Sequence, residues 1–196
     1  NIICQLLDTA GAKIDSNFVI NDDMKSTQLY ASAASNNKGN VVVTWYDYRN
    51  SFPQIYSQKI VNTQLNGNNF TVSEEELKST KTNVSCSIND KGKIVVSWLN
   101  YTDLTEYQVF SRILDSSKSP ISETFRVDND ENSSAQSSPE LITFDDSSYI
   151  IVWTDNRNRT SNIFFQIYNS DGTLLGENKI AGSTSYKLYP KIIQLK

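Results

Sequence analysis

The chain of 196 residues contains no histidine. This absence excludes Ser-His-Asp and Cys-His catalysis, histidine-ligated metal sites and histidine pH switches. The net charge is −4, whereas a phosphate-binding surface needs clustered lysine and arginine, so we expect no nucleic-acid partner. No apolar run approaches the roughly 20 residues of a membrane helix, so we expect no membrane span. We also expect no cofactor.

Cysteine is scarce as well. Cys4 and Cys86 are the only two, and their separation matches no metal-site spacing. Each lies among apolar or small residues, which favours buried free thiols that behave as small hydrophobic groups. A disulfide between them stays open as the alternative.

The residues that are present indicate a folded, secreted protein. Hydrophobic residues make up 38% of the chain, with 8 Phe, 10 Tyr and 3 Trp, which excludes a disordered tail and suits one domain. Asparagine, serine, threonine and tyrosine are abundant, as in many secreted bacterial surface proteins, and we expect an extracellular or cell-surface location. No basic stretch with an apolar core begins at Asn1, so we expect that any signal peptide was removed or lay further upstream.

An internal repeat is the strongest signal. Trp45, Trp98 and Trp153 each end an apolar run, and they are 53 and 55 residues apart. Three further markers share this period. The first is a residue 14 positions before each Trp, the second a polar residue 13 or 14 positions after it, and the third a short F-x-V-like segment. These markers are Ala31, Val84 and Pro139; Gln58, Arg112 and Gln166; and 18–20, 70–72 and 125–127.

Each repeat predicts four short β-strands, and no segment has the apolar period of a helix. The strand that ends in Trp is continuously apolar, which is typical of a strand covered on both faces. Four-stranded antiparallel units at this period predict an all-β fold, a β-propeller whose first strands line a central channel. A tandem of immunoglobulin-like sandwiches would need about seven strands per roughly 100 residues, twice the observed period.

The repeat boundaries predict incomplete blades at both ends of the chain. Residues 1–21 match the outer strands of a preceding blade, and 187–196 match the first strand of a following one. Three complete blades lie between them, over 28–73, 82–128 and 137–181. We therefore expect the open blades to be completed by the rest of a longer propeller or by a neighbouring chain, because exposed strand edges invite aggregation.

The repeats resemble those in β-propeller regions of large secreted or surface-anchored bacterial proteins, which follow the pattern W-x-D-x-R-N, then I-Y-x-Q, then D-G. The middle repeat departs from this pattern, with WLNYTD at 98–103 and Arg112 in place of Gln. The resemblance implies propeller blades and a role in interaction or scaffolding, without naming a ligand. The matching segments are WYDYRN at 45–50, QIYSQ at 54–58, WTDNRN at 153–158, NIFFQ at 162–166 and SDGTLLG at 170–176.

Charged and aromatic side chains after the Trp strands are candidate ligand-binding residues. An Asp-x-Arg pair follows two of the three tryptophans, and it fits a turn in which Asp accepts backbone N–H bonds and Arg pairs with it. On a propeller face the same charged side chains would bind a carboxylate or a sugar hydroxyl, and tyrosines nearby would stack on sugar rings. The candidates are Tyr46, Asp47, Tyr48, Arg49, Tyr101, Asp155 and Arg157.

Asp128, Asp130 and Asn132 alternate in a spacing that resembles the start of a calcium loop. An EF-hand-type loop needs Gly at its sixth position and a carboxylate at its twelfth, where this chain has Ser133 and Pro139. The sequence therefore favours a solvated acidic turn, with a metal site as the weaker alternative.

These features predict a non-catalytic extracellular module that binds protein or glycan, with no catalytic residue. One alternative is a fragment of a propeller glycoside hydrolase or lyase that works with carboxylates. Glu140 is the only acidic residue inside a predicted channel-lining strand of the three repeats, and one carboxylate is not an acid/base pair. A further alternative is a structural subunit of a surface filament or matrix, assembled by strand addition.

Overall fold

The computed structural model describes residues 1–74, 79–101, 106–130, 134–157, 159–176, 178–181 and 187–194. These residues form β-strands and loops without a helix, as the sequence predicts. Accordingly, the described part of the chain has no helix of the length and apolarity that crossing a membrane requires. The strands are β1 (Ile3–Leu7), β2 (Lys13–Val19), β3 (Gln28–Ser35), β4 (Val41–Asn50), β5 (Phe52–Val61), β6 (Gln64–Leu65), β7 (Phe70–Thr71), β8 (Thr80–Ile88), β9 (Ile94–Tyr101), β10 (Gln108–Leu114), β11 (Phe125–Arg126), β12 (Gln136–Thr143), β13 (Tyr149–Asp155), β14 (Asn162–Tyr168) and β15 (Lys179–Ile180).

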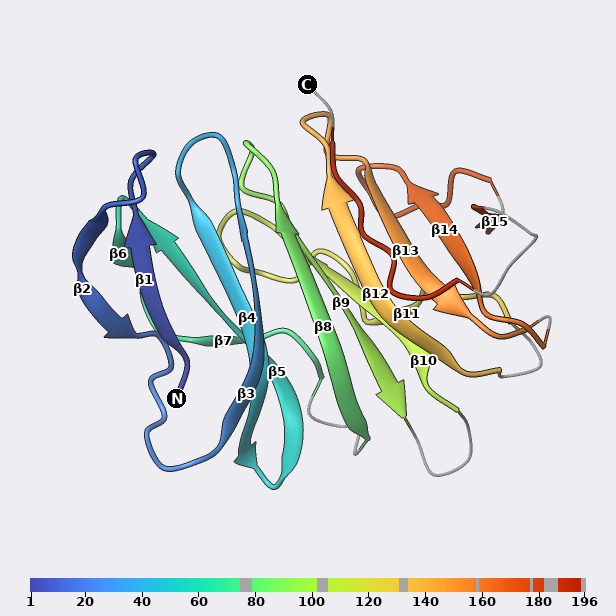
Figure 1. The fold of residues 1–196 in the computed structure, drawn as a ribbon, viewed down its shortest axis with the longest axis horizontal. Helices are drawn as coiled ribbons and strands as arrows, with labels where there is room; N and C mark the ends of the chain where they lie inside the picture. Colours follow the sequence, from blue (N-terminus) through green and yellow to red (C-terminus); the bar gives the residue numbers. More distant parts are fainter. Residues whose placement is uncertain are drawn as a thin grey trace.

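The strands form four antiparallel sheets that follow one another across the molecule (Figure 1). The first sheet is the hairpin β1-β2. The second has the order β3-β4-β5-β6 with β7 also paired to β5, the third β8-β9-β10-β11, and the fourth β12-β13-β14-β15. Each of the three larger sheets thus pairs neighbouring strands of one repeat, and each begins at a free edge formed by its first strand.

Two of the strands that end in Trp, β4 and β9, are apolar on both faces because each lies between two neighbouring sheets, whereas β13 lies in the last sheet and packs against the third. In β9, Val95 and Leu99 pack toward the fourth sheet, whereas Val96 and Trp98 pack toward the second. A third cluster, around Trp45, joins the second sheet to the hairpin β1-β2. Burial of apolar surface between consecutive sheets is therefore what holds them together.

Polar turns at one end of the sheets add directional contacts. The Asn36 side chain accepts backbone N–H bonds within its own turn and donates from Nδ2 to the carbonyl of Asn89, 2.9 Å away. Asn89 does the same one sheet further on, donating to the carbonyl of Phe144 at 3.0 Å. These hydrogen bonds fix the turns of three successive sheets relative to one another.

Residues 187–196 are predicted as the first strand of a further blade; 195–196 lie outside the described residues, and 187–194 form no regular strand. They lie against β12, where Lys191 makes an ion pair with Glu140. Cys4 is half-buried, Cys86 is buried, and both are free thiols. Burial raises the pKa of the Cys86 thiol to about 11, which keeps it protonated and unreactive near neutral pH.

Candidate functional site

The first strands of the three larger sheets share an irregularity that the sequence did not predict. The pairing of β3 with β4, of β8 with β9 and of β12 with β13 shifts register at a β-bulge. In each bulge one residue adopts a left-handed backbone conformation, with φ of 53° at Tyr30 and 51° at both Asn83 and Ser138. Tyr189, at the matching place in 187–194, has φ of 57°. Bulges re-aim side chains and are over-represented beside active sites.

A hollow of about 240 Å³ opens beside the bulges of β8 and β12 and residues 189–191. Asn83, Ser138, Glu140, Tyr189 and Lys191 contribute its polar and aromatic lining, so three separate segments of the chain meet there. The Glu140 carboxylate pairs with the Lys191 ammonium, and the Ser85 hydroxyl donates to it over 3.4 Å. This hollow brings the acidic residue of the predicted channel-lining strand together with hydroxyl, amide and aromatic groups.

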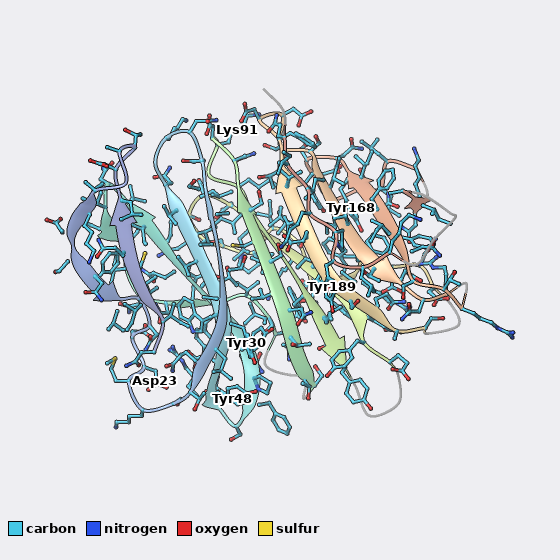
Figure 2. All side chains as sticks on the ribbon, viewed as in Figure 1. Asp23, Tyr30, Tyr48, Lys91, Tyr168 and Tyr189 are labelled. Atoms are coloured by element: carbon cyan, nitrogen blue, oxygen red, sulfur yellow. The ribbon has the colours of Figure 1, made fainter. Side chains whose placement is uncertain are left out.

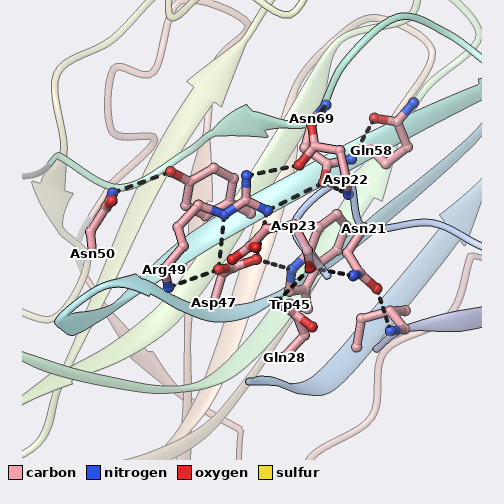
Figure 3. Close-up of polar contacts among 12 residues, drawn as sticks. Asn21, Asp22, Asp23, Gln28, Trp45, Asp47, Arg49, Asn50, Gln58 and Asn69 are labelled. Atoms are coloured by element: carbon pink, nitrogen blue, oxygen red, sulfur yellow. Dashed lines mark hydrogen bonds and ion pairs between the residues drawn. The ribbon is translucent and has the colours of Figure 1, made fainter. Parts of the chain in front are cut away.

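Asp47 and Arg49 form a closed cluster at the end of β4 (Figure 3). Asp47 Oδ1 accepts the backbone N–H of Arg49 at 3.0 Å and its Nε at 2.9 Å. Oδ2 accepts the Trp45 indole N–H at 3.0 Å and Arg49 Nη2 at 2.8 Å. Arg49 also pairs with Asp22 at 2.8 Å, and its guanidinium lies 4.0 Å from the centre of the Tyr56 ring.

Asp155 and Arg157 repeat this geometry in the fourth sheet. Asp155 accepts the Trp153 indole N–H at 3.0 Å and Arg157 Nη2 at 2.8 Å. The middle repeat has Asn100 at the matching position, and the buried Trp98 indole N–H has no acceptor among the described residues. Asp47 and Asp155 thus make the contacts of the predicted turn, in which Asp accepts a backbone N–H and pairs with Arg. A ligand-binding role of either residue stays a prediction.

The charges of Asp47 and Arg49 balance each other within this cluster. Burial acts to raise the pKa of Asp47, but the hydrogen bonds from Arg49 and Trp45 outweigh it and lower the pKa overall. The same carboxylate, through its hydrogen bonds, raises the pKa of Arg49. The carboxylate is buried, and four donors surround its two oxygens, so its lone pairs are directed at internal partners.

The three candidate tyrosines differ in their exposure. Tyr46 is only 4% exposed, and its hydroxyl accepts the backbone N–H of Asn83, so the expected exposed ring is absent there. Stacking on a sugar would need Tyr46 exposed on a loop, whereas Tyr46 lies inside β4 and packs in the apolar cluster between the second and third sheets. Tyr48 and Tyr101 are 40% and 36% exposed, and Tyr101 packs against Tyr107 with ring centres 5.0 Å apart. Figure 2 shows Tyr48 at one end of the sheets.

Asp128 and Asp130, from the calcium-like segment, are buried and bonded to protein groups. Asp128 pairs with Arg126 and accepts the backbone N–H of Val109 at 3.2 Å, and Asp130 accepts that of Ser134 at 2.8 Å. They are therefore not the solvated turn that the sequence favours. Asn132 lies outside the described residues. Within the described ranges, no three acidic or cysteine side chains converge as a metal site would require.

No protein-family model matches the chain, and no curated protein is significantly similar to it in sequence. Solved structures do resemble it in fold. An α-L-arabinanase of Penicillium chrysogenum, complexed with arabinobiose, is 13% identical with a TM-score of 0.58 over 81% of this chain and 51% of the arabinanase. A GH93 α-L-arabinofuranosidase of Fusarium graminearum is 13% identical with a TM-score of 0.56 over 86% and 54%.

An endo-arabinase of Bacteroides thetaiotaomicron is 10% identical with a TM-score of 0.53, over 85% of this chain and 66% of the endo-arabinase. The chain thus spans half to two-thirds of the length of these structures. At such identities the likeness shows the fold alone, and these proteins are β-propeller glycoside hydrolases.

The prediction of a non-catalytic interaction or scaffold module is contradicted by these likenesses, which favour the glycoside hydrolase alternative. The prediction rested on repeat motifs that specify blades without an activity, and on a single carboxylate in the predicted channel-lining strands. In the structure Asp47, Asp155 and Tyr46 make internal hydrogen bonds. A hollow with both apolar and polar lining residues lies instead on the first strands, around Glu140.

Proposed function

We propose that the protein is a glycoside hydrolase built on a β-propeller, and that this chain contributes consecutive blades of it. The fold likeness to arabinan-degrading hydrolases supports this, and so does the order of strands within each sheet. The observation that carries the proposal is Glu140, a carboxylate in an exposed hollow on the first strands. Arabinan or related arabinosides are the proposed substrates, and an extracellular location suits a polymer that cannot enter the cell.

Glu140 is the proposed catalytic carboxylate. Glycoside hydrolysis requires two carboxyl groups, one to protonate the leaving group and one to act as nucleophile or general base. The ion pair with Lys191 suits the second role, because a general acid must carry a proton that it can donate. The sequences of β3, β8 and β12 contain no other acidic residue, so the proposal assigns the second carboxyl group to another part of the protein.

The proposed arrangement of blades follows from the packing of the sheets. Consecutive sheets share apolar clusters, and their first strands lie next to one another along one edge. In a propeller those strands surround the central channel. The Glu140 hollow would then open into that channel, where substrate meets carboxylates from several blades.

The test is hydrolysis of linear arabinan and of an aryl α-L-arabinofuranoside by the full-length protein. Glu140→Gln keeps the size of the side chain but removes its charge, and we expect the rate to fall by about 10² to 10⁴-fold. Glu123→Gln is the matched control, because Glu123 is exposed and lies outside the hollow, and its rate should be unchanged. Undiminished hydrolysis by Glu140→Gln, or no activity of the parent protein on either substrate, would contradict the proposal.

A further inference from the structure

The row of bulges presents two tyrosines at its ends. Along the row lie Tyr30 on β3, Asn83 on β8, Ser138 on β12 and Tyr189 in 187–194, all with left-handed backbones. Tyr30 is 73% exposed and Tyr189 is 74% exposed, whereas Asn83 and Ser138 between them are small and polar. Figure 2 shows the two tyrosines on either side of β8.

The two tyrosines occupy an unfavourable backbone conformation without gaining burial. A left-handed conformation costs a residue with a Cβ atom roughly 1–2 kcal/mol, and glycine or asparagine adopts it more readily. Strain of this kind clusters at ligand-binding sites, where surrounding contacts hold it in place. At Tyr30 such a contact is present: its ring packs against Tyr46 with centres 5.6 Å apart, and Tyr46 accepts the backbone N–H of Asn83.

The chemistry of the row matches a chain of sugars. Exposed tyrosine rings offer apolar faces to the C–H groups of a sugar and a hydroxyl to its polar edge. Asn83, Ser138 and the Glu140–Lys191 pair supply hydrogen-bond donors and acceptors between the rings. A single sugar cannot touch both tyrosines, because two bulged strands separate them.

We propose that Tyr30 and Tyr189 are stacking platforms at the two ends of an oligosaccharide site that crosses β3, β8 and β12 past Glu140. This inference rests on the proposed function and narrows it: the substrate is an internal stretch of a polysaccharide rather than one terminal sugar. Binding then strengthens with chain length until both platforms are covered.

Titration calorimetry on the Glu140→Gln protein tests this without turnover. The probes are arabinobiose and arabino-oligosaccharides from the trimer to the hexamer. Tyr30→Asn and Tyr189→Asn remove each ring but keep a residue that tolerates the left-handed backbone, as Asn83 does at the matching position. We expect each to weaken binding of the longest oligosaccharides about ten-fold, and to flatten the dependence on length. Tyr30→Phe and Tyr189→Phe should retain binding, as should Leu65→Ala, which removes an exposed side chain on the outer strand β6.

The outcomes separate the two proposals. If Glu140 is needed for hydrolysis but both Asn variants bind the hexamer as the parent does, the platform proposal is wrong and the hydrolase proposal stands. If the tyrosines are needed for binding but arabinan is not hydrolysed, the hydrolase proposal falls and the platforms stand. Affinity that does not increase with chain length in the parent also overturns the platform proposal.

Discussion

At the scale of single residues, the repeated motif serves a structural purpose. The Trp45 indole N–H is buried, and a buried donor without a partner costs about 1–3 kcal/mol. Asp47 accepts a hydrogen bond from that indole N–H, and Arg49 balances the charge that the carboxylate brings into the sheet. The Asp-x-Arg pair after Trp153 makes the same contacts with a buried indole N–H, whereas the middle repeat has Asn100 at this position and the buried Trp98 indole N–H has no acceptor among the described residues.

Asp47→Asn should therefore reduce stability rather than activity. The variant replaces an acceptor by an amide N–H that faces Arg49 and Trp45, and we expect a loss of roughly 2–4 kcal/mol in urea unfolding at pH 7. The folded-state pKa of Asp47 lies below the ordinary 3.8, so its stabilising contribution is complete above that pH and is lost as the pH falls through the lower folded value. The difference between parent and variant should shrink below about pH 4. Glu123→Gln should match the parent throughout, and a difference for Asp47→Asn that is independent of pH would contradict this account.

At the scale of elements, the Trp-ended strands were predictable and the bulges were not. β4 and β9 are apolar on both faces because each is covered by a sheet on either side, and β13 packs one face against the third sheet. This burial makes the three strands recognisable in the sequence as apolar runs. A left-handed backbone conformation can be recognised from the sequence only when the residue is glycine or asparagine, and three of the four residues here are tyrosine or serine. Residues 187–194 match β12 in their pattern of residues, but none of the described strands pairs with them, and they form no regular strand.

Substitutions at Ser138 test whether the bulge conformation is required. Ser138→Val places a β-branched side chain at φ of 51°, which should lower the free energy of unfolding by about 1–2 kcal/mol. Ser138→Gly should be neutral or slightly stabilising, since glycine adopts this conformation without strain. Ser137→Val is the control one residue earlier, outside the left-handed region, where valine suits a strand. Urea unfolding of the three variants measures this, and equal stability of the Val and Gly variants at 138 would contradict it.

At the scale of the whole molecule, the hollow exists only because the sheets pack side by side. Asn83, Glu140 and Lys191 come from three successive segments of the chain. The sequence singled out Glu140 as an acidic residue on a channel-lining strand, but its ion pair and the neighbouring tyrosine depend on how far each strand is displaced by its bulge. The site therefore depends on apolar clusters that lie away from it, between the sheets.

Ile94→Ala tests how tightly the sheets are coupled. Ile94 is buried in the cluster between the second and third sheets, and its truncation should cost about 2–5 kcal/mol. Because consecutive sheets share apolar clusters, we expect the loss to spread along the stack and to lower the unfolding midpoint of every sheet. Trp45 and Trp153 lie in different sheets, so variants that retain only one or the other report on each side by fluorescence. The two reporters should shift together with the far-ultraviolet circular dichroism, while Ile121→Ala, at an exposed position, should leave all three unchanged. A shift confined to one reporter would mean that the sheets unfold independently, and the hollow would then lack the rigid support that a catalytic carboxylate needs.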